Sequence, residues 1–129
     1  MKDKIIYGLI FGVFWLIASL PFRILYLISD VLAFLLYRVV GYRRKVVRNN
    51  LTNSFPDKEL SEIIKIEKQF YQYISDYFME EIKTMRISHK QLMRRMEYHN
   101  QKEYLDLIEE YGGVILLIPH YANFEWIIG

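Results

Sequence analysis

A histidine and a carboxylate, His120 and Glu125, lie five positions apart near the C-terminal end of the sequence. An imidazole takes up a proton near neutral pH. A carboxylate that accepts a hydrogen bond from one ring nitrogen fixes the tautomer and raises the basicity of the other nitrogen. The sequence has no cysteine, and this segment has no serine or threonine. The pair would therefore act as a general base with its orienting partner, and the nucleophile would be a hydroxyl of the substrate.

The two side chains meet only if the chain turns between them, because a spacing of five places them about 140° apart on a regular helix. Val114–Ile118 is an unbroken apolar run, typical of a strand buried on both faces, and Pro119 ends it by lacking an N–H. We expect His120 on the turn that leaves this strand, where α/β sheets usually bind ligands. A helix from residues 122–123 would then place Glu125 in its first turn, where the dipole favours a carboxylate.

The spacing alone is weak evidence, because many sequences contain such a pair by chance and a single histidine after a strand is more often structural. A metal hydrolase is a further alternative. It would need more histidine ligands near His120, and the other two histidines of the sequence are His89 and His99.

The residues before the apolar run have the order of a parallel-sheet unit. Met96–His99 is a candidate short strand. Gln101–Tyr111 has apolar residues at helical spacing, and Gly112–Gly113 supplies the left-handed residue that ends such a helix. Strand, helix and then the strand Val114–Ile118 predict an α/β fold.

A long amphipathic helix is predicted from Leu60 to Met85, after the turn at Pro56. Glu67 interrupts its apolar face. Ser88–Gln91 has the form of a capping box and predicts a short helix after it. Three acidic residues lie near the end of the long helix, against the preference of the helix dipole: Asp76, Glu80 and Glu81.

The N-terminal part of the chain is apolar. Ile5 to Leu20 contains no charged residue, and a spanning helix needs about 20 apolar residues, with about 17 as the lower limit. We expect an uncleaved membrane anchor; a signal peptide and a buried core helix are the alternatives. A second apolar run, Ile24–Val40, is interrupted by Ser29 and Asp30, which favours a helix lying at the membrane interface.

A basic cluster follows these apolar runs and contains Arg43, Arg44, Lys45 and Arg48. Basic residues beside an apolar helix are typical of contact with anionic lipid, at about 1 kcal/mol each. A solvated charged face is the alternative. Residues 1–55 carry a net charge of +6 and residues 56–129 a net charge of −4, so the basic excess flanks the apolar segments. No nucleic-acid-binding motif is present.

Two segments resemble a known family. Gly113–Trp126 reads GVILLIPHYANFEW and resembles the first motif of the bacterial lipid A late (secondary) acyltransferases, within the wider glycerolipid acyltransferase group. Arg43–Leu51 and the SFP that follows are similar to the segment joining that family's anchor to its first long helix. The resemblance implies that His120 is the catalytic histidine and Glu125 its acidic partner. Asn123, inside the motif, is a weaker candidate for contact with substrate.

The resemblance implies a membrane-bound enzyme at the cytoplasmic side of the bacterial inner membrane. Such an enzyme moves a fatty acyl chain from acyl carrier protein or coenzyme A to a hydroxyl of a lipid A precursor, without a cofactor or metal. Residues 1–42 would be the membrane anchor and interfacial helix. Residues 43–129 would be the N-terminal part of an α/β acyltransferase domain whose sheet, mostly parallel, is incomplete here. We expect this mostly helical chain to be a fragment and inactive by itself.

Two alternatives to a lipid A acyltransferase remain open. The acceptor could be a glycerolipid, an ornithine lipid or another glycolipid, and each is distinguished by assaying the corresponding lysolipid. The chain could instead be a non-catalytic membrane-anchored helical module. In that case His120 and Glu125 could be exchanged without effect.

Overall fold

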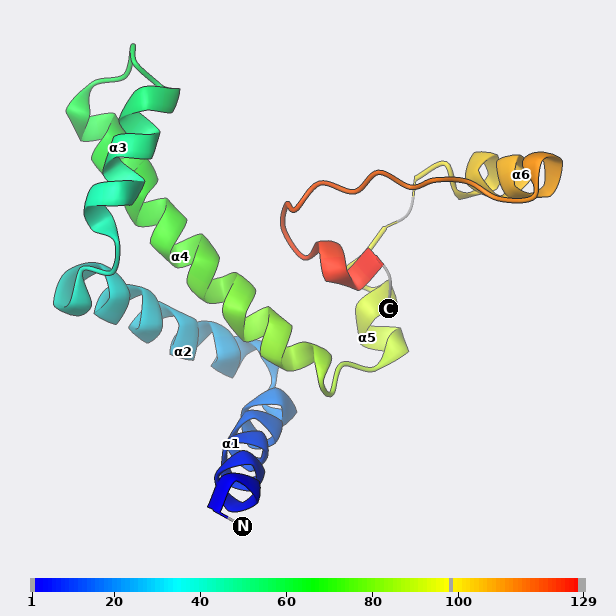
Figure 1. Ribbon diagram of the computed structural model, residues 1–129, viewed down its shortest axis with the longest axis horizontal. Helices are drawn as coiled ribbons and strands as arrows, with labels where there is room; N and C mark the ends of the chain where they lie inside the picture. The colour runs from blue at the N-terminus through cyan, green and yellow to red at the C-terminus, as the bar shows by residue number, and fades with distance from the viewer. Residues whose placement is uncertain (1, 98, 128–129) are drawn as a thin grey trace. The chain divides into compact units, whose positions relative to one another are not determined.

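The computed structural model describes residues 2–97 and 99–127 and divides the chain into two compact units, Met1–Arg86 and Ile87–Gly129 (Figure 1). The first unit contains α1 (Lys2–Ser19), α2 (Phe22–Phe34), the π-helix η1 (Leu35–Val40), α3 (Arg44–Ser54) and α4 (Leu60–Thr84). The second contains α5 (His89–Met93), α6 (Gln101–Tyr111) and the short 3₁₀-helix η2 (Phe124–Ile127).

The two N-terminal apolar runs are both helical, as the sequence predicts. Pro21 separates them and precedes the first turn of α2, where its fixed φ is compatible with a helix start. In the described part of the chain, no helix taken singly has the length and apolarity to cross a membrane. Asp3–Ser19 and Phe22–Val40 meet that requirement as a pair, but they are bent by 120° at the break between them.

The other helices of the first unit pack against α4 (Figure 1). The core of this unit forms where α1, α2 and α4 meet. Its buried residues are Ala18, Leu25, Met79 and Ile82. The predicted helix Leu60–Met85 is confirmed as α4, because its apolar stripe repeats at the helical period and buries one face.

Polar contacts from α2 account for two of the three acidic residues near the end of α4, Asp76 and Glu80. The Ser29 hydroxyl donates to Asp76 over 2.5 Å, and the Tyr26 hydroxyl donates to Glu80 over 2.5 Å. Lys83, which is only 5% exposed, donates to the carbonyl oxygens of Ala18 and Leu20 over 2.8 Å each. Partners on neighbouring segments thus offset the unfavourable position of these acids relative to the α4 dipole.

The helix boundaries of the second unit also follow the sequence signals. Gln91 N–H donates to the Ser88 hydroxyl and the Gln91 side chain accepts from Ser88 N–H, which confirms the capping box at α5. The predicted helix Gln101–Tyr111 is confirmed as α6. Gly112 ends it with a φ of +74°, a conformation that glycine adopts at no steric cost.

The strands of the expected α/β domain are not formed within the described residues. Val114–Ile118 is neither helical nor paired, and Ile115 and Leu117 are 92% and 90% exposed. Residues 96, 97 and 99 lie in turns or irregular chain, while Tyr98 falls outside the described residues. A parallel sheet needs neighbouring strands, so the α/β fold stays a prediction about a longer protein.

Candidate active site

A tight turn separates His120 from Glu125. Tyr121 N–H donates to the Pro119 carbonyl over 2.8 Å, and Ala122 has a φ of +52°. These two features reverse the chain so that η2 begins at Phe124. The predicted turn between the two candidate residues is therefore present. Glu125 lies in the first turn of a helix, as the sequence indicates, but this 3₁₀-helix begins at Phe124 rather than at residues 122–123.

The side chains around this turn differ in burial. His120 is exposed, and its ring lies 4.5 Å from the ring of Phe124 at 60°. Asn123 and Glu125 are half-buried, and Trp126 is buried at 4% exposure. Across the described residues, no hydrogen bond joins His120 to Glu125. The contact that makes the two a catalytic pair therefore stays a prediction.

The arrangement supports the chemistry of a general base. His120 is exposed, so a substrate hydroxyl can approach its side chain. Glu125 follows His120 by five positions, with the turn at Tyr121 and Ala122 between them. Catalytic hydrogen bonds are often long in structures without substrate and shorten when it binds. The second unit also has a cavity of about 640 Å³, but its described lining, which includes Leu116 and Ile127, contains neither His120 nor Glu125.

The basic cluster has a structural partner that sequence reasoning missed. Glu67 on α4 is fully buried, and its two carboxylate oxygens accept hydrogen bonds from Nε of Arg44 and Nε of Arg48. The Arg44–Glu67 distance is 3.1 Å. The guanidinium carbon of Arg44 also lies 4.3 Å from the centre of the Tyr37 ring, in cation–π range. The sequence did contain an indication of this cluster, because Glu67 interrupts the apolar face of α4 and a buried acid needs a partner.

The two arginines keep Glu67 ionised. Burial by itself raises the pKa of this carboxyl, but hydrogen bonds from Arg48 and Arg44 outweigh burial and hold the pKa below its ordinary value of 4.5. The same hydrogen bond raises the pKa of Arg48. A buried carboxylate with two charged donors connects α3 to α4.

The pairing with Glu67 divides the four basic candidates. Arg44 and Arg48 point their Nε atoms toward α4, whereas Arg43 and Lys45 are exposed. The lipid-surface role stays a prediction for all four residues. Arg43 and Lys45 are the stronger candidates, because their charges are not directed at Glu67. Among the residues that the structure describes, no three histidine, aspartate or glutamate side chains are grouped so that they could hold a metal ion.

Comparisons with known proteins cover nearly the whole chain. The sequence model of a bacterial lipid A biosynthesis acyltransferase family matches residues 2–128. Over 114 residues the chain is 25% identical to the lipid A biosynthesis lauroyltransferase of Escherichia coli (strain K12). That alignment covers 88% of this chain and 37% of the relative, so the chain spans little more than a third of that protein's length. No solved structure matches the chain.

Proposed function

The chain belongs to the bacterial lipid A biosynthesis acyltransferase family, and from that premise we propose that it is the N-terminal part of an enzyme that transfers a fatty acyl chain to a hydroxyl of a lipid A precursor. The family match over residues 2–128 carries this proposal. Two observations support it: His120 is exposed, and a short helix that carries Glu125 in its first turn begins four residues later.

In the proposed reaction, His120 removes the proton from the acceptor hydroxyl. The hydroxyl oxygen attacks the thioester carbonyl carbon of the donor, and the carbon–sulfur bond breaks as the new ester forms. Glu125 accepts a hydrogen bond from the other imidazole nitrogen and stabilises the imidazolium. The thiol that leaves has a pKa of about 8.5, so its thiolate needs little acid assistance. We propose acyl carrier protein or coenzyme A as the carrier.

Membrane attachment is part of the same proposal, at the cytoplasmic side of the bacterial inner membrane. Apolar side chains of α1 are exposed around the helix, with Ile5, Tyr7, Leu9 and Leu16 between 60% and 69% exposed. A helix that is hydrophobic on all sides needs an apolar environment. Lipid would supply it, and the basic cluster after Gly41 would contact anionic headgroups.

The decisive experiment measures acyl transfer by the full-length protein that contains this chain. We expect His120→Ala to lower the rate by about 10²- to 10⁴-fold, since general-base catalysis contributes about that much. Membrane association should be unchanged. His89→Ala is the matched control, because His89 is also exposed but lies on α5. Retained turnover in the His120 variant would contradict its assignment as the base. If the enzyme acylates a lysolipid but not the lipid A precursor, the proposed acceptor is wrong.

A further inference from the structure

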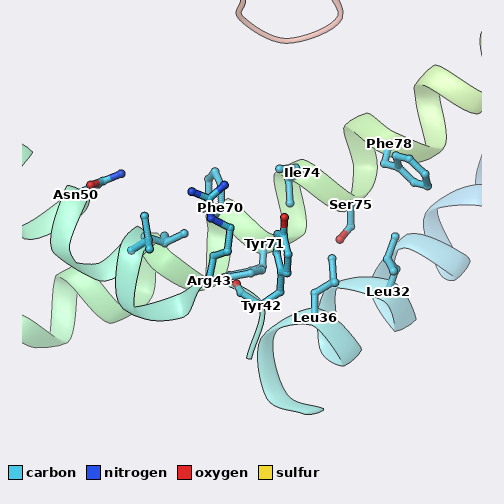
Figure 2. Close-up of a pocket in the computed structure, with 12 residues that line it drawn as sticks. Leu32, Leu36, Tyr42, Arg43, Asn50, Phe70, Tyr71, Ile74, Ser75 and Phe78 are labelled. Carbon is cyan, nitrogen blue, oxygen red and sulfur yellow. Dashed lines mark hydrogen bonds between the residues drawn. The ribbon is translucent and has the colours of Figure 1, made fainter. Parts of the chain in front are cut away.

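The first unit contains an apolar groove between η1, α3 and α4 (Figure 2). Its volume is about 550 Å³, within the roughly 300–1,000 Å³ of ligand pockets. Most of its lining is aliphatic or aromatic. The lining residues are Leu32, Leu36, Tyr42, Arg43, Val46, Val47, Asn50, Phe70, Tyr71, Ile74, Ser75 and Phe78.

A buried hydroxyl faces this groove. Ser75 is 1% exposed, and no described residue forms a hydrogen bond with its Oγ atom. Figure 2 shows the hydroxyl pointing from α4 toward the side of the groove where Leu36 lies. A buried polar group without a partner is costly, which indicates that an acceptor or donor from outside the described chain completes this site.

A basic hollow adjoins the apolar groove at the start of α3. It has a volume of about 510 Å³ and shares Arg43 and Val46 with the groove. The other residues that line it are Gly41, Arg44, Lys45 and Arg48. The first turn of α3 contains no acidic residue, and a helix N-terminus favours an anion. Positive charge and an apolar channel thus lie side by side.

We propose that the groove and the hollow together bind one anionic phospholipid of the membrane. The phosphate lies in the hollow beside Arg43 and Lys45, whose charges are not directed at Glu67. The lipid passes Ile74, an ester carbonyl accepts a hydrogen bond from Ser75, and the acyl chain continues toward Phe78. Figure 2 shows this order along the groove, with Asn50 and Arg43 toward one end and Phe78 at the other.

A lipid can reach this site directly from a bilayer. Leu36 lines the groove, and three other residues of η1, Leu35, Val39 and Val40, are apolar side chains at 42%, 65% and 67% exposure. These residues would rest in the apolar part of the membrane beside the groove. The inference rests on the membrane association proposed above but is independent of acyl transfer, since every residue involved belongs to the first unit.

The test uses the full-length protein in phosphatidylcholine vesicles that contain a trace of phosphatidylglycerol with a photoactivatable acyl chain. Mass spectrometry then locates the labelled peptides. We expect labelling of the α2–η1 peptide that contains Leu32 and Leu36. Ile74→Trp, which fills the groove, should lower that labelling at least about fivefold. Leu60→Trp is the matched control, because it places the same large side chain on an exposed position of α4 outside the groove.

A second arm tests the headgroup. The same chain photoprobe on phosphatidylcholine should label the peptide less, and Arg43→Gln should reduce the preference for phosphatidylglycerol by about fivefold. Equal labelling by the two probes would overturn the proposal, as would an unlabelled groove in vesicle-bound protein, which would mean that another segment of a longer chain covers it. Acyl transfer is measured in the same samples. If the full-length protein is labelled in the groove but does not transfer acyl chains, the proposed function is contradicted. If it transfers acyl chains but the groove is not labelled, only this inference is contradicted.

Discussion

At the scale of single residues, Glu67 is the best-defined ionic group of the chain. Its carboxylate is fully buried and binds Arg44 and Arg48, whose side chains are 40% and 30% exposed. A buried carboxylate is stable only when its charge is paired and its oxygens accept hydrogen bonds. Glu67 thus joins α4 to α3.

Replacing Glu67 tests this role. We expect Glu67→Gln to lower the free energy of unfolding at pH 7 by about 2 kcal/mol, because hydrogen bonds to charged groups contribute roughly 1.5–3 kcal/mol and both arginines keep some solvent contact. Chemical denaturation in detergent, followed by circular dichroism, measures the change. Glu62→Gln is the control on the same helix: its pair with Lys58 is exposed, so the loss should be below about 1 kcal/mol.

The stabilisation that Glu67 contributes depends on pH. The pKa of Glu67 is lower in the folded chain than in the unfolded chain, so fewer protons bind to the folded state. The stabilisation is therefore present above about pH 4.5 and is lost as the pH falls through the folded-state pKa. The wild type should lose more stability than Glu67→Gln between pH 7 and about pH 3. Parallel acid-unfolding curves for the two proteins would rule out this role.

Glu125 is expected to act through His120. In the full-length enzyme, Glu125→Gln should reduce kcat at least about tenfold, but by less than the loss of the histidine, because the base itself remains. Glu125→Asp should recover part of the rate, whereas a structural role would show no such rescue. Glu110→Gln on α6 is the control.

At the scale of elements, the junction between η1 and α3 sets the position of the basic cluster. η1 ends at Gly41, whose φ is +64°, and Tyr42 N–H donates back to the Leu36 carbonyl over 3.0 Å. Arg43 follows with a φ of +52° before α3 begins. Two left-handed residues on either side of Tyr42 thus connect η1 to α3, which packs on α4 so that Arg44 and Arg48 reach Glu67.

Gly41→Ala tests this junction. An added Cβ would meet nothing closer than the Arg44 side chain at 3.8 Å, so sterics outside the backbone are not the obstacle. The obstacle is the positive φ at this position, which costs an L-residue roughly 1–2 kcal/mol. We expect a loss of stability of that size in chemical denaturation. Gly8→Ala should instead raise stability, because Gly8 lies inside α1 with open space around it. Equal changes in stability for Gly41→Ala and Gly8→Ala would contradict the role of the positive φ at Gly41.

At the scale of the whole molecule, the two units differ in how much they bury. The first unit encloses a core at the junction of α1, α2 and α4, as well as the Glu67 cluster. The second leaves the apolar run Val114–Ile118 largely exposed. An exposed run of this kind pairs readily with other strands. Strands from the remaining length of the full protein are the expected partners.

The first unit is therefore expected to fold independently of the second. A polypeptide of residues 1–86 should keep the helical circular dichroism of α1 to α4 and unfold cooperatively in detergent. Introducing Glu67→Gln into it should cause the same loss of stability as in the longer chain. A polypeptide of residues 1–58 is the control, because it lacks α4 and hence Glu67. Non-cooperative unfolding of residues 1–86 would contradict the division into two units.

The sequence by itself predicted the helices α1, α2, α4, α5 and α6 and pointed to the candidate catalytic pair, but it did not predict α3. Helical periodicity, the capping box at Ser88 and the glycine after Tyr111 act within a few residues, so local spacing predicts them. The turn between His120 and Glu125 is equally local. The strand Val114–Ile118 depends on neighbouring strands, and the chain described here does not test it.

Only the tertiary structure decided which distant side chains meet. The sequence marked Glu67 as an interruption of the apolar face, but its partners are 19 and 23 residues away and are brought to it by the packing of α3 on α4. The apolar groove with the buried Ser75 likewise exists only between packed helices. Contacts of this kind depend on how elements pack against one another, because burial is what makes an unpaired charge or hydroxyl costly.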